Sequence, residues 1–395
     1  MYRQSMRPRR NNNRYRPHRG GGRGNGGFKI KTFDPSRVVD NVPEFTQEEY
    51  EPKHTFSDFA ISGNLKESIS KRGYTIPTPI QDQTIPEILQ NKDVVGIANT
   101  GTGKTAAFLI PLVNKVMQNR NQRVLVIAPT RELAVQIEKE LMLFTRNLGI
   151  HSVVCIGGVS INPQIYKLQR RPQFVIGTPG RLLDLSAQRK LDFGQFESVV
   201  LDEVDRMLDM GFIRDIQEII SQLPRRRQSL FFSATVGDNV MNIMKQFTLK
   251  PVRISVKTQD SVVNVDQEII RVGGRSKIEV LQDLLDKREF EKVLVFGRTK
   301  RGADKLTRDL VKMGFLVSAI HGNKTQNQRQ RSLEMFRDGK VNVLIATDVV
   351  ARGIDVDNIT HVINYELPET YDHYLHRIGR TGRAGRKGKA LTFVN

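Results

Sequence analysis

The sequence predicts an α/β protein of two domains, each a parallel sheet flanked by helices. From about Phe56 onward, short runs rich in Val and Ile alternate with longer amphipathic stretches. The short runs are almost continuously apolar, which is typical of parallel strands covered on both faces. They form two sets, separated by the polar stretch 256–265, which has no helical period. The predicted strands lie within residues 93–98, 123–128, 151–156, 173–178, 198–203, 229–235, 292–299, 316–322, 342–348, 361–368 and 390–395.

The polar stretch between the two groups of strands gives the expected domain boundaries. A chain of 395 residues has room for two to three domains. We expect a tail and lead-in over residues 1–50, a first domain over 51–255, a linker over 256–263 and a second domain over 264–395.

The N-terminal tail is strongly basic. Ten Lys and Arg side chains precede the first acid, Asp34, and account for half of the net charge of +20. The segment is rich in Arg, Gly and Asn and poor in apolar residues, so we expect it to be disordered. Two interpretations stay open: a loose arm that binds RNA through charge and stacking, or a tail that only aids solubility.

Composition excludes several classes of protein. The single cysteine, Cys155, rules out an intramolecular disulfide and a Cys/His metal cluster. We find no signal peptide and no apolar run approaching the length of a membrane span, so we expect a cytoplasmic protein with no membrane partner. The basic balance favours nucleic acid as the partner.

A glycine-rich loop follows the first predicted strand. In ANTGTGKT, residues 98–105, the loop leads into a predicted helix at Lys104 and Thr105. Backbone N–H groups of such a loop cradle phosphates, the lysine reaches the β- and γ-phosphates, and the hydroxyl can ligate Mg²⁺. We therefore predict ATP binding by Thr100, Gly101, Thr102, Gly103, Lys104 and Thr105.

An acidic cluster follows the strand candidate at 198–203. In a phosphate-loop protein, an acid at a neighbouring strand end holds the magnesium shell, a role that suits Asp202. Glu203 can orient and deprotonate the attacking water, while Asp205 is spaced to face the SAT triplet or the other domain. Thr105 and Asp202 are thus the candidate Mg²⁺ ligands, partly through water.

With these motifs in place, the chain resembles the DEAD-box RNA helicases over roughly residues 54–395. The motifs occur in the family's order, which implies two tandem RecA-like domains. Val204 stands where the family has Ala, and Gly297 stands where another residue is more usual. The matching segments are GYTIPTPIQ (73–81), ANTGTGKT (98–105), PTRELA (129–134), GG (157–158), TPGR (178–181), DEVD (202–205), SAT (233–235), VFGRTK (295–300), QNQR (326–329), TDVVARGID (347–355) and HRIGRTGR (376–383).

The resemblance implies roles for individual residues. Gln81 would hydrogen-bond the adenine edge, Phe56 would stack on the ring, and Asp355 would touch the ribose. Arg380 and Arg383 would act as arginine fingers from the second domain. Coupling of the ATP site to strand separation would involve Asp205, Ser233, Thr235 and His376. RNA contacts, mainly to the backbone, would come from Thr130, Arg131, Gly158, Thr178, Arg181, Arg298, Thr299, Thr347 and Asp348.

The expected function is an ATP-dependent RNA helicase that uses ATP and Mg²⁺ and separates short duplexes locally rather than processively. An ATP-gated RNA clamp or annealing factor with little unwinding is the alternative, and a DNA helicase of the same superfamily is a third reading. The sequence does not name the RNA. Ribosome-assembly and RNA-decay factors fit as partners, and we expect a monomer.

Overall fold

The computed structural model describes residues 50–99, 101–256, 264–348, 356, 358–382 and 386–394. The tail prediction over residues 1–49, most of the predicted linker, and the predicted site residues Thr100, Asp355 and Arg383 lie outside these ranges. Within them, no helix combines the length and apolar character needed to span a bilayer.

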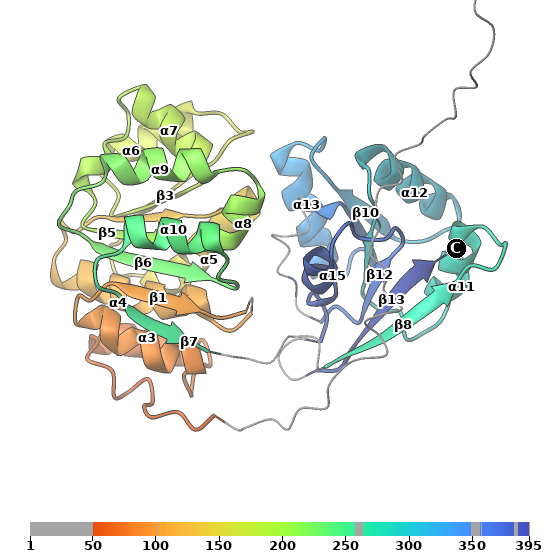
Figure 1. Cartoon of the computed structure of the whole chain (residues 1–395), viewed down its shortest axis with the longest axis horizontal. Coiled ribbons are helices and arrows are strands. Elements are labelled where there is room, and N and C mark those ends of the chain that lie inside the picture. Colours follow the sequence, from red (N-terminus) through yellow and green to blue (C-terminus); the bar gives the residue numbers. More distant parts are fainter. Residues whose placement is uncertain are drawn as a thin grey trace, which may run out of the picture.

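The described chain forms two parallel sheets flanked by helices, as the sequence predicts (Figure 1). The first sheet has the order β3-β4-β2-β5-β6-β1-β7 and the second the order β10-β11-β9-β12-β13-β8, with every pair of neighbouring strands parallel. The strands are β1 (Val94–Ile97), β2 (Val124–Ile127), β3 (Ser152–Cys155), β4 (Phe174–Gly177), β5 (Ser198–Leu201), β6 (Gln228–Ser233), β7 (Val252–Ser255), β8 (Val265–Arg271), β9 (Val293–Phe296), β10 (Val317–Ile320), β11 (Val343–Ala346), β12 (His361–Asn364) and β13 (Gly388–Val394).

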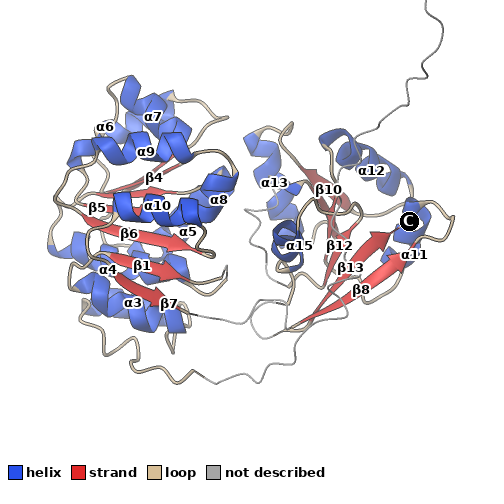
Figure 2. Ribbon diagram, viewed as in Figure 1, coloured by secondary structure: helices blue, strands red, loops and turns tan. Residues whose placement is uncertain are grey.

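Helices cover both faces of the first sheet (Figure 2). Side chains of successive strand residues point to opposite faces, so Val94 and Val124 join one buried cluster while Val95 and Leu125 join the other. The helices of this half are α2 (Gly63–Lys71), α3 (Pro79–Leu89), α4 (Lys104–Gln118), α5 (Arg131–Thr145), α6 (Asn162–Gln169), α7 (Pro179–Ala187), the 3₁₀ turn η1 (Phe193–Gln195), α8 (Val204–Asp209), α9 (Ile213–Gln222) and α10 (Asp238–Phe247).

The second sheet is built in the same way, with α13 and α15 on the side toward the first half (Figure 1). Ser276 and Thr325 begin two of its helices with reciprocal capping boxes, which satisfy backbone N–H groups of the first turn. The helices here are α11 (Lys277–Leu285), α12 (Lys300–Lys312), α13 (Gln326–Arg337) and α15 (Tyr371–Ile378).

Two strands, β7 and β8, are absent from the sequence prediction. Both are edge strands, and their side chains are mostly exposed or half-buried, so neither has the continuous apolar run that marks the inner strands. Val204, the departure from the family motif, is fully buried but begins α8 rather than extending a strand.

Candidate functional site

The predicted site residues follow the carboxyl ends of the strands. In a parallel sheet these ends share one edge, where α/β proteins bind ligands. In the first sheet β1 leads to the phosphate loop, β2 to PTRELA, β5 to DEVD and β6 to SAT. The topology therefore gathers at one edge motifs that are far apart in the sequence.

The phosphate loop is shaped by two glycines. Gly101 and Gly103 have φ of 83° and 89°, in the left-handed region that glycine adopts without strain. Lys104 begins α4, is 6% exposed, and its Nζ donates to the Ala98 carbonyl at 2.6 Å. The lysine is thus folded back over the loop, beside the start of the helix that carries Thr105.

The first turn of α3 is bonded directly to this loop. The Thr78 hydroxyl donates to the Thr102 carbonyl at 2.8 Å, and the Gln81 amide nitrogen donates to the Gly103 carbonyl at 3.1 Å. Gln81 also accepts from the Thr78 N–H at 3.0 Å. A primary amide has two donor hydrogens and two acceptor lone pairs, so one of each remains for a base edge. A Cβ on Gly103 would overlap the Gln81 amide, so this close approach requires glycine.

Phe56 lies in the core beside this turn. It is 6% exposed and packs edge-on against Phe59 and Tyr74, with ring centroids 5.8 Å away in each case. Only a small part of its ring is accessible for the predicted stacking on adenine.

The acidic cluster after β5 is buried. Burial raises the pKa of Asp202 to about 7, the neighbouring Glu203 charge adds to the rise, and Lys104 opposes it. Glu203 adopts a left-handed backbone with φ of 52°, a conformation that costs energy in a non-glycine residue. Its carboxylate accepts from Arg206 Nη1 at 2.5 Å, and both side chains are almost fully buried. The arrangement places two carboxylates and one guanidinium at the end of β5.

Asp205 faces the SAT triplet. One of its carboxylate oxygens accepts from the Ala234 and Thr235 N–H groups at 3.2 and 3.1 Å and from the Thr235 hydroxyl at 3.2 Å. The Ser233 hydroxyl donates to the Thr235 carbonyl at 2.8 Å. The end of β6 is therefore fastened to the acidic cluster that follows β5.

The predicted RNA residues of the first half lie at neighbouring strand ends. The Arg131 guanidinium lies against Gly158, whose φ is 75°, and a Cβ there would overlap it. Thr130 caps α5 by accepting from the Leu133 N–H at 3.2 Å. Arg181 reaches the Val159 carbonyl, next to Gly158, and Thr178 precedes α7 as its N-cap residue.

In the second half, Arg298 and Thr299 are exposed after β9, and Thr347 is buried after β11. Asp348 forms a two-pronged ion pair with the buried Arg377, at 2.6 and 2.8 Å. Its carboxylate therefore anchors Arg377, a role that the sequence does not predict. Arg380 is 4% exposed, and its Nε donates to the carbonyl of His376.

Sequence reasoning missed a contact between the two halves. Glu132, in the first turn of α5, accepts from Gln326 at 3.1 Å and pairs with Arg329 at 2.8 Å, both in the first turn of α13. Glu132 and Arg329 are 4% and 8% exposed. A second pair between the same helices, Lys139 and Glu334 at 3.3 Å, is about half exposed. The acid directly after Arg131 in a predicted RNA motif is the signal that could have been followed.

Comparison with known proteins identifies the family of this chain. Residues 78–243 match the DEAD/DEAH box helicase family, and residues 276–385 match the helicase conserved C-terminal domain. The chain belongs to the DEAD-box ATP-dependent RNA helicase family, because it is 46% identical to a family member from Bacillus licheniformis, over 86% of this chain and 70% of the relative.

The similar proteins include several bacterial helicases named CshA. The ATP-dependent RNA helicase CshA of Listeria monocytogenes is 45% identical over 86% of this chain and 66% of its own length. The DEAD-box ATP-dependent RNA helicase CshA of Streptococcus pneumoniae is 46% identical, over 86% and 65%. This chain therefore spans about two thirds of the length of these relatives.

Solved structures share the fold. S. cerevisiae Dbp5 bound to RNA and ADP BeF3 has a TM-score of 0.76 at 32% identity, covering 86% of this chain and 89% of that one. Mss116p bound to ssRNA and AMP-PNP has a TM-score of 0.78 at 28% identity, covering 88% and 76%.

Proposed function

We propose that this chain is an RNA-dependent ATPase that couples ATP hydrolysis to local, non-processive separation of RNA duplexes. One observation carries the proposal: the phosphate loop, the acidic cluster and the RNA motifs of the first half lie at the same edge of its sheet. Helix α5, which begins at this edge, is joined to α13 of the second half by a buried ion pair. The relatives' names and the RNA in the similar solved structures support the same activity.

ATP and Mg²⁺ would bind at the loop after β1. Within the described ranges no group of three or more His, Cys, Asp and Glu could hold a metal, but magnesium needs only one or two protein oxygens beside phosphates and water. Thr105 and Asp202 fit that requirement. The raised pKa of Asp202 marks a buried carboxylate with too little positive charge nearby, which a dication would supply. The ion would neutralise charge on the phosphate oxygens.

Glu203 would orient and deprotonate the attacking water, and Arg206 holds its carboxylate in place. Arg380 and Arg383 of the second half would neutralise the transferring phosphoryl group, an effect worth ~10³–10⁵ in rate in related systems. Because the loop and these arginines belong to different halves, hydrolysis would require the halves to close.

RNA would lie across both halves and be held through its backbone by Arg131, Arg181, Arg298 and their neighbours. A duplex of ten steps holds on the order of 14 kcal/mol at about 1.4 kcal/mol per step. A single closure could therefore break only a few steps, which favours local separation. The alternative is an RNA clamp that binds ATP and RNA in the same way but separates few duplexes. The presence of both Glu203 and Arg380 favours an enzyme.

The broader setting follows from these proposals. We propose that the chain acts as a monomer in the cytoplasm, alongside ribosome-assembly or RNA-decay factors. The net charge of +20 supports RNA as its partner. No surface among the described residues names a particular partner.

The deciding experiment measures ATPase rate without nucleic acid and with single-stranded RNA, duplex RNA or duplex DNA. We expect stimulation by RNA alone, and a loss of about 10²–10⁴-fold in Glu203→Gln, the range for losing a general base. Glu67→Gln is the matched control, because Glu67 is an exposed carboxylate on α2 that pairs with the exposed Lys71. Equal stimulation by DNA would contradict the RNA assignment. ATP-dependent RNA binding with negligible turnover would favour the clamp.

A further inference from the structure

A buried carboxylate beside the adenine-reading residue has no part in the mechanism above. Asp82 is 1% exposed and lies in the first turn of α3, directly after Gln81. A buried acid normally carries a cost unless hydrogen bonds compensate it. For Asp82 these hydrogen bonds come from outside its own helix, from a segment that is distant in the sequence.

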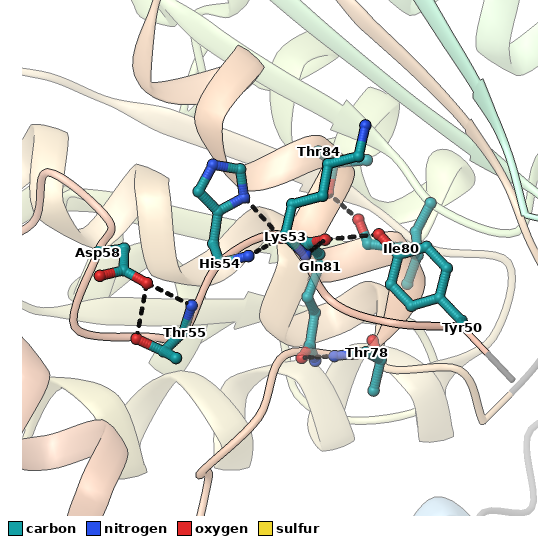
Figure 3. Close-up of polar contacts among 10 residues, drawn as sticks. Tyr50, Lys53, His54, Thr55, Asp58, Thr78, Ile80, Gln81 and Thr84 are labelled. Carbon is teal, nitrogen blue, oxygen red and sulfur yellow. Dashed lines mark hydrogen bonds and ion pairs between the residues drawn. The ribbon is translucent and has the colours of Figure 1, made fainter.

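Four hydrogen bonds reach Asp82 from the segment Tyr50–His54. Figure 3 shows Tyr50, Lys53 and His54 of this segment beside Gln81. One carboxylate oxygen accepts from the Tyr50 hydroxyl at 2.5 Å and from the Lys53 N–H at 2.8 Å. The other accepts from the His54 N–H at 3.1 Å and lies 2.7 Å from His54 Nδ1. An ionised carboxylate only accepts, so His54 Nδ1 carries a proton in this contact. We call Asp82, Tyr50, Lys53 and His54 the Asp82 clasp.

The clasp ties this segment to the first turn of α3. Residues 50–53 and 55 are exposed and His54 is half-buried, so none is fixed by burial in the core. Burial alone would raise the pKa of Asp82, but the hydrogen bonds from Tyr50, Lys53 and His54 outweigh it and the pKa is lowered. The ionised form is therefore the one that the fold stabilises.

The clasp also fixes the turn that carries Gln81. Successive residues of an α-helix are separated by about 100° around its axis, so the two side chains leave the turn in different directions. Asp82 is held by the segment 50–54, while Gln81 reaches the Gly103 carbonyl of the phosphate loop. Two residues beyond the segment, Phe56 packs into the core. A shift of this turn would move the Gln81 amide away from the position it holds against the phosphate loop.

We propose that Asp82 is a positioning residue for base recognition: through the clasp it holds Gln81 and the Phe56 segment in register, and so sets the preference for adenine over other bases. The inference deepens the proposed function and rests on it. Asp82 touches neither substrate nor phosphate loop in this scheme, so its effect falls on nucleotide selectivity rather than on chemistry.

The test compares ATP and GTP in Asp82→Asn, which keeps the volume but replaces one acceptor oxygen by a donor. We expect KM for ATP to rise about tenfold, kcat to stay within about twofold, and KM for GTP to change less. Tyr50→Phe removes one of the four hydrogen bonds and should give a smaller shift in the same direction. Asp58→Asn is the matched control, because this exposed carboxylate caps Thr55 in the same region without reaching α3.

Binding of ADP and GDP, measured by calorimetry, gives the same comparison without turnover. A fall in the ADP-to-GDP affinity ratio in Asp82→Asn supports the clasp even if the wild type lacks RNA-stimulated hydrolysis, which would defeat the proposed function alone. Equal shifts for both nucleotides, or a lower melting temperature with an unchanged ratio, would overturn the inference. An unchanged ratio in an active enzyme leaves the proposed function standing without the clasp.

Discussion

The buried ion pair between Glu132 and Arg329 should control closure of the two halves. Both side chains are almost fully buried at the contact between the halves, and they would become hydrated if the halves separated. Removing one partner leaves an uncompensated charge that closure must bury, at a cost of about 3–5 kcal/mol. At the lower end, about 3 kcal/mol corresponds to about 150-fold. We therefore expect Glu132→Ala and Arg329→Ala each to lower kcat/KM for RNA in the ATPase assay by about 100-fold.

The double variant separates the pair from other effects of each truncation. With both charges removed, no unpaired charge is buried, so the double variant should recover much of the loss. The part that it does not recover includes the hydrogen bond that the buried Gln326 donates to Glu132. The pair Lys139 and Glu334 is the matched control, because it joins the same two helices but is about half exposed. Exposed pairs contribute about 0.2–1 kcal/mol, so its cycle should show at most about a fivefold effect.

Closure itself can be followed by fluorescence transfer between dyes. The native Cys155 is fully buried, and burial raises the pKa of its thiol to about 12, so it should not compete for maleimide. Cysteines at the exposed positions Lys190 and Lys312 would report on one half each. A coupling energy for the buried pair no larger than that of the exposed pair would refute the reasoning. So would normal ATP- and RNA-driven closure in Glu132→Ala.

Two further predictions follow from the site and the second sheet. Gly158→Ala should strain a backbone with φ of 75° and displace the Arg131 guanidinium. We expect the RNA concentration for half-maximal ATPase activity to rise about tenfold, while KM for ATP stays within about twofold. An unchanged RNA requirement would contradict this prediction. Burial lowers the pKa of His361, which stacks on Phe290, to about 4 from 6.5. The unfolded chain therefore binds more protons between these values, and stability should fall by about 2 kcal/mol from pH 7 to pH 5. Thermal melts should show a flatter pH dependence in His361→Phe, and equal slopes would count against the assignment.

The inner strands and their motifs could be predicted because they are locally encoded. A continuous apolar run followed by glycine or acid identifies both the strand and the residue at its end, as in β1 before Gly101 and β5 before Asp202. The edge strands β7 and β8 have no such run, because polar and charged residues interrupt them and their side chains are mostly exposed or half-buried. The opposite edge strands, β3 and β10, carry apolar runs and are predicted from the sequence. Their pairing is decided by tertiary contacts that no short window contains.

The contacts around the site could not be predicted for a related reason. Glu132 meets a partner almost 200 residues further along the chain, and Asp82 meets the segment 50–54 about 30 residues earlier. Motif spacing describes each residue's neighbours along the chain, but it does not show which distant segments contact that residue in the folded protein. The acid in PTRELA nevertheless carries a clue, because a carboxylate beside Arg131 would repel phosphate and has to face something other than RNA.

The energetics of the Glu132 pair also limit what can drive closure. A buried ion pair regains in attraction roughly what it loses in hydration, so the complete pair adds little net free energy to the closed state. The pair instead selects how the two halves meet. Any closed arrangement that separates Glu132 from Arg329 would bury two unpaired charges. The driving force has to come from ligands that bind the closed form more tightly than the open one, since a ligand with equal affinity for both shifts nothing. Nucleotide and RNA bridging both halves would provide that difference, and the pair would select the one closed arrangement in which hydrolysis can occur.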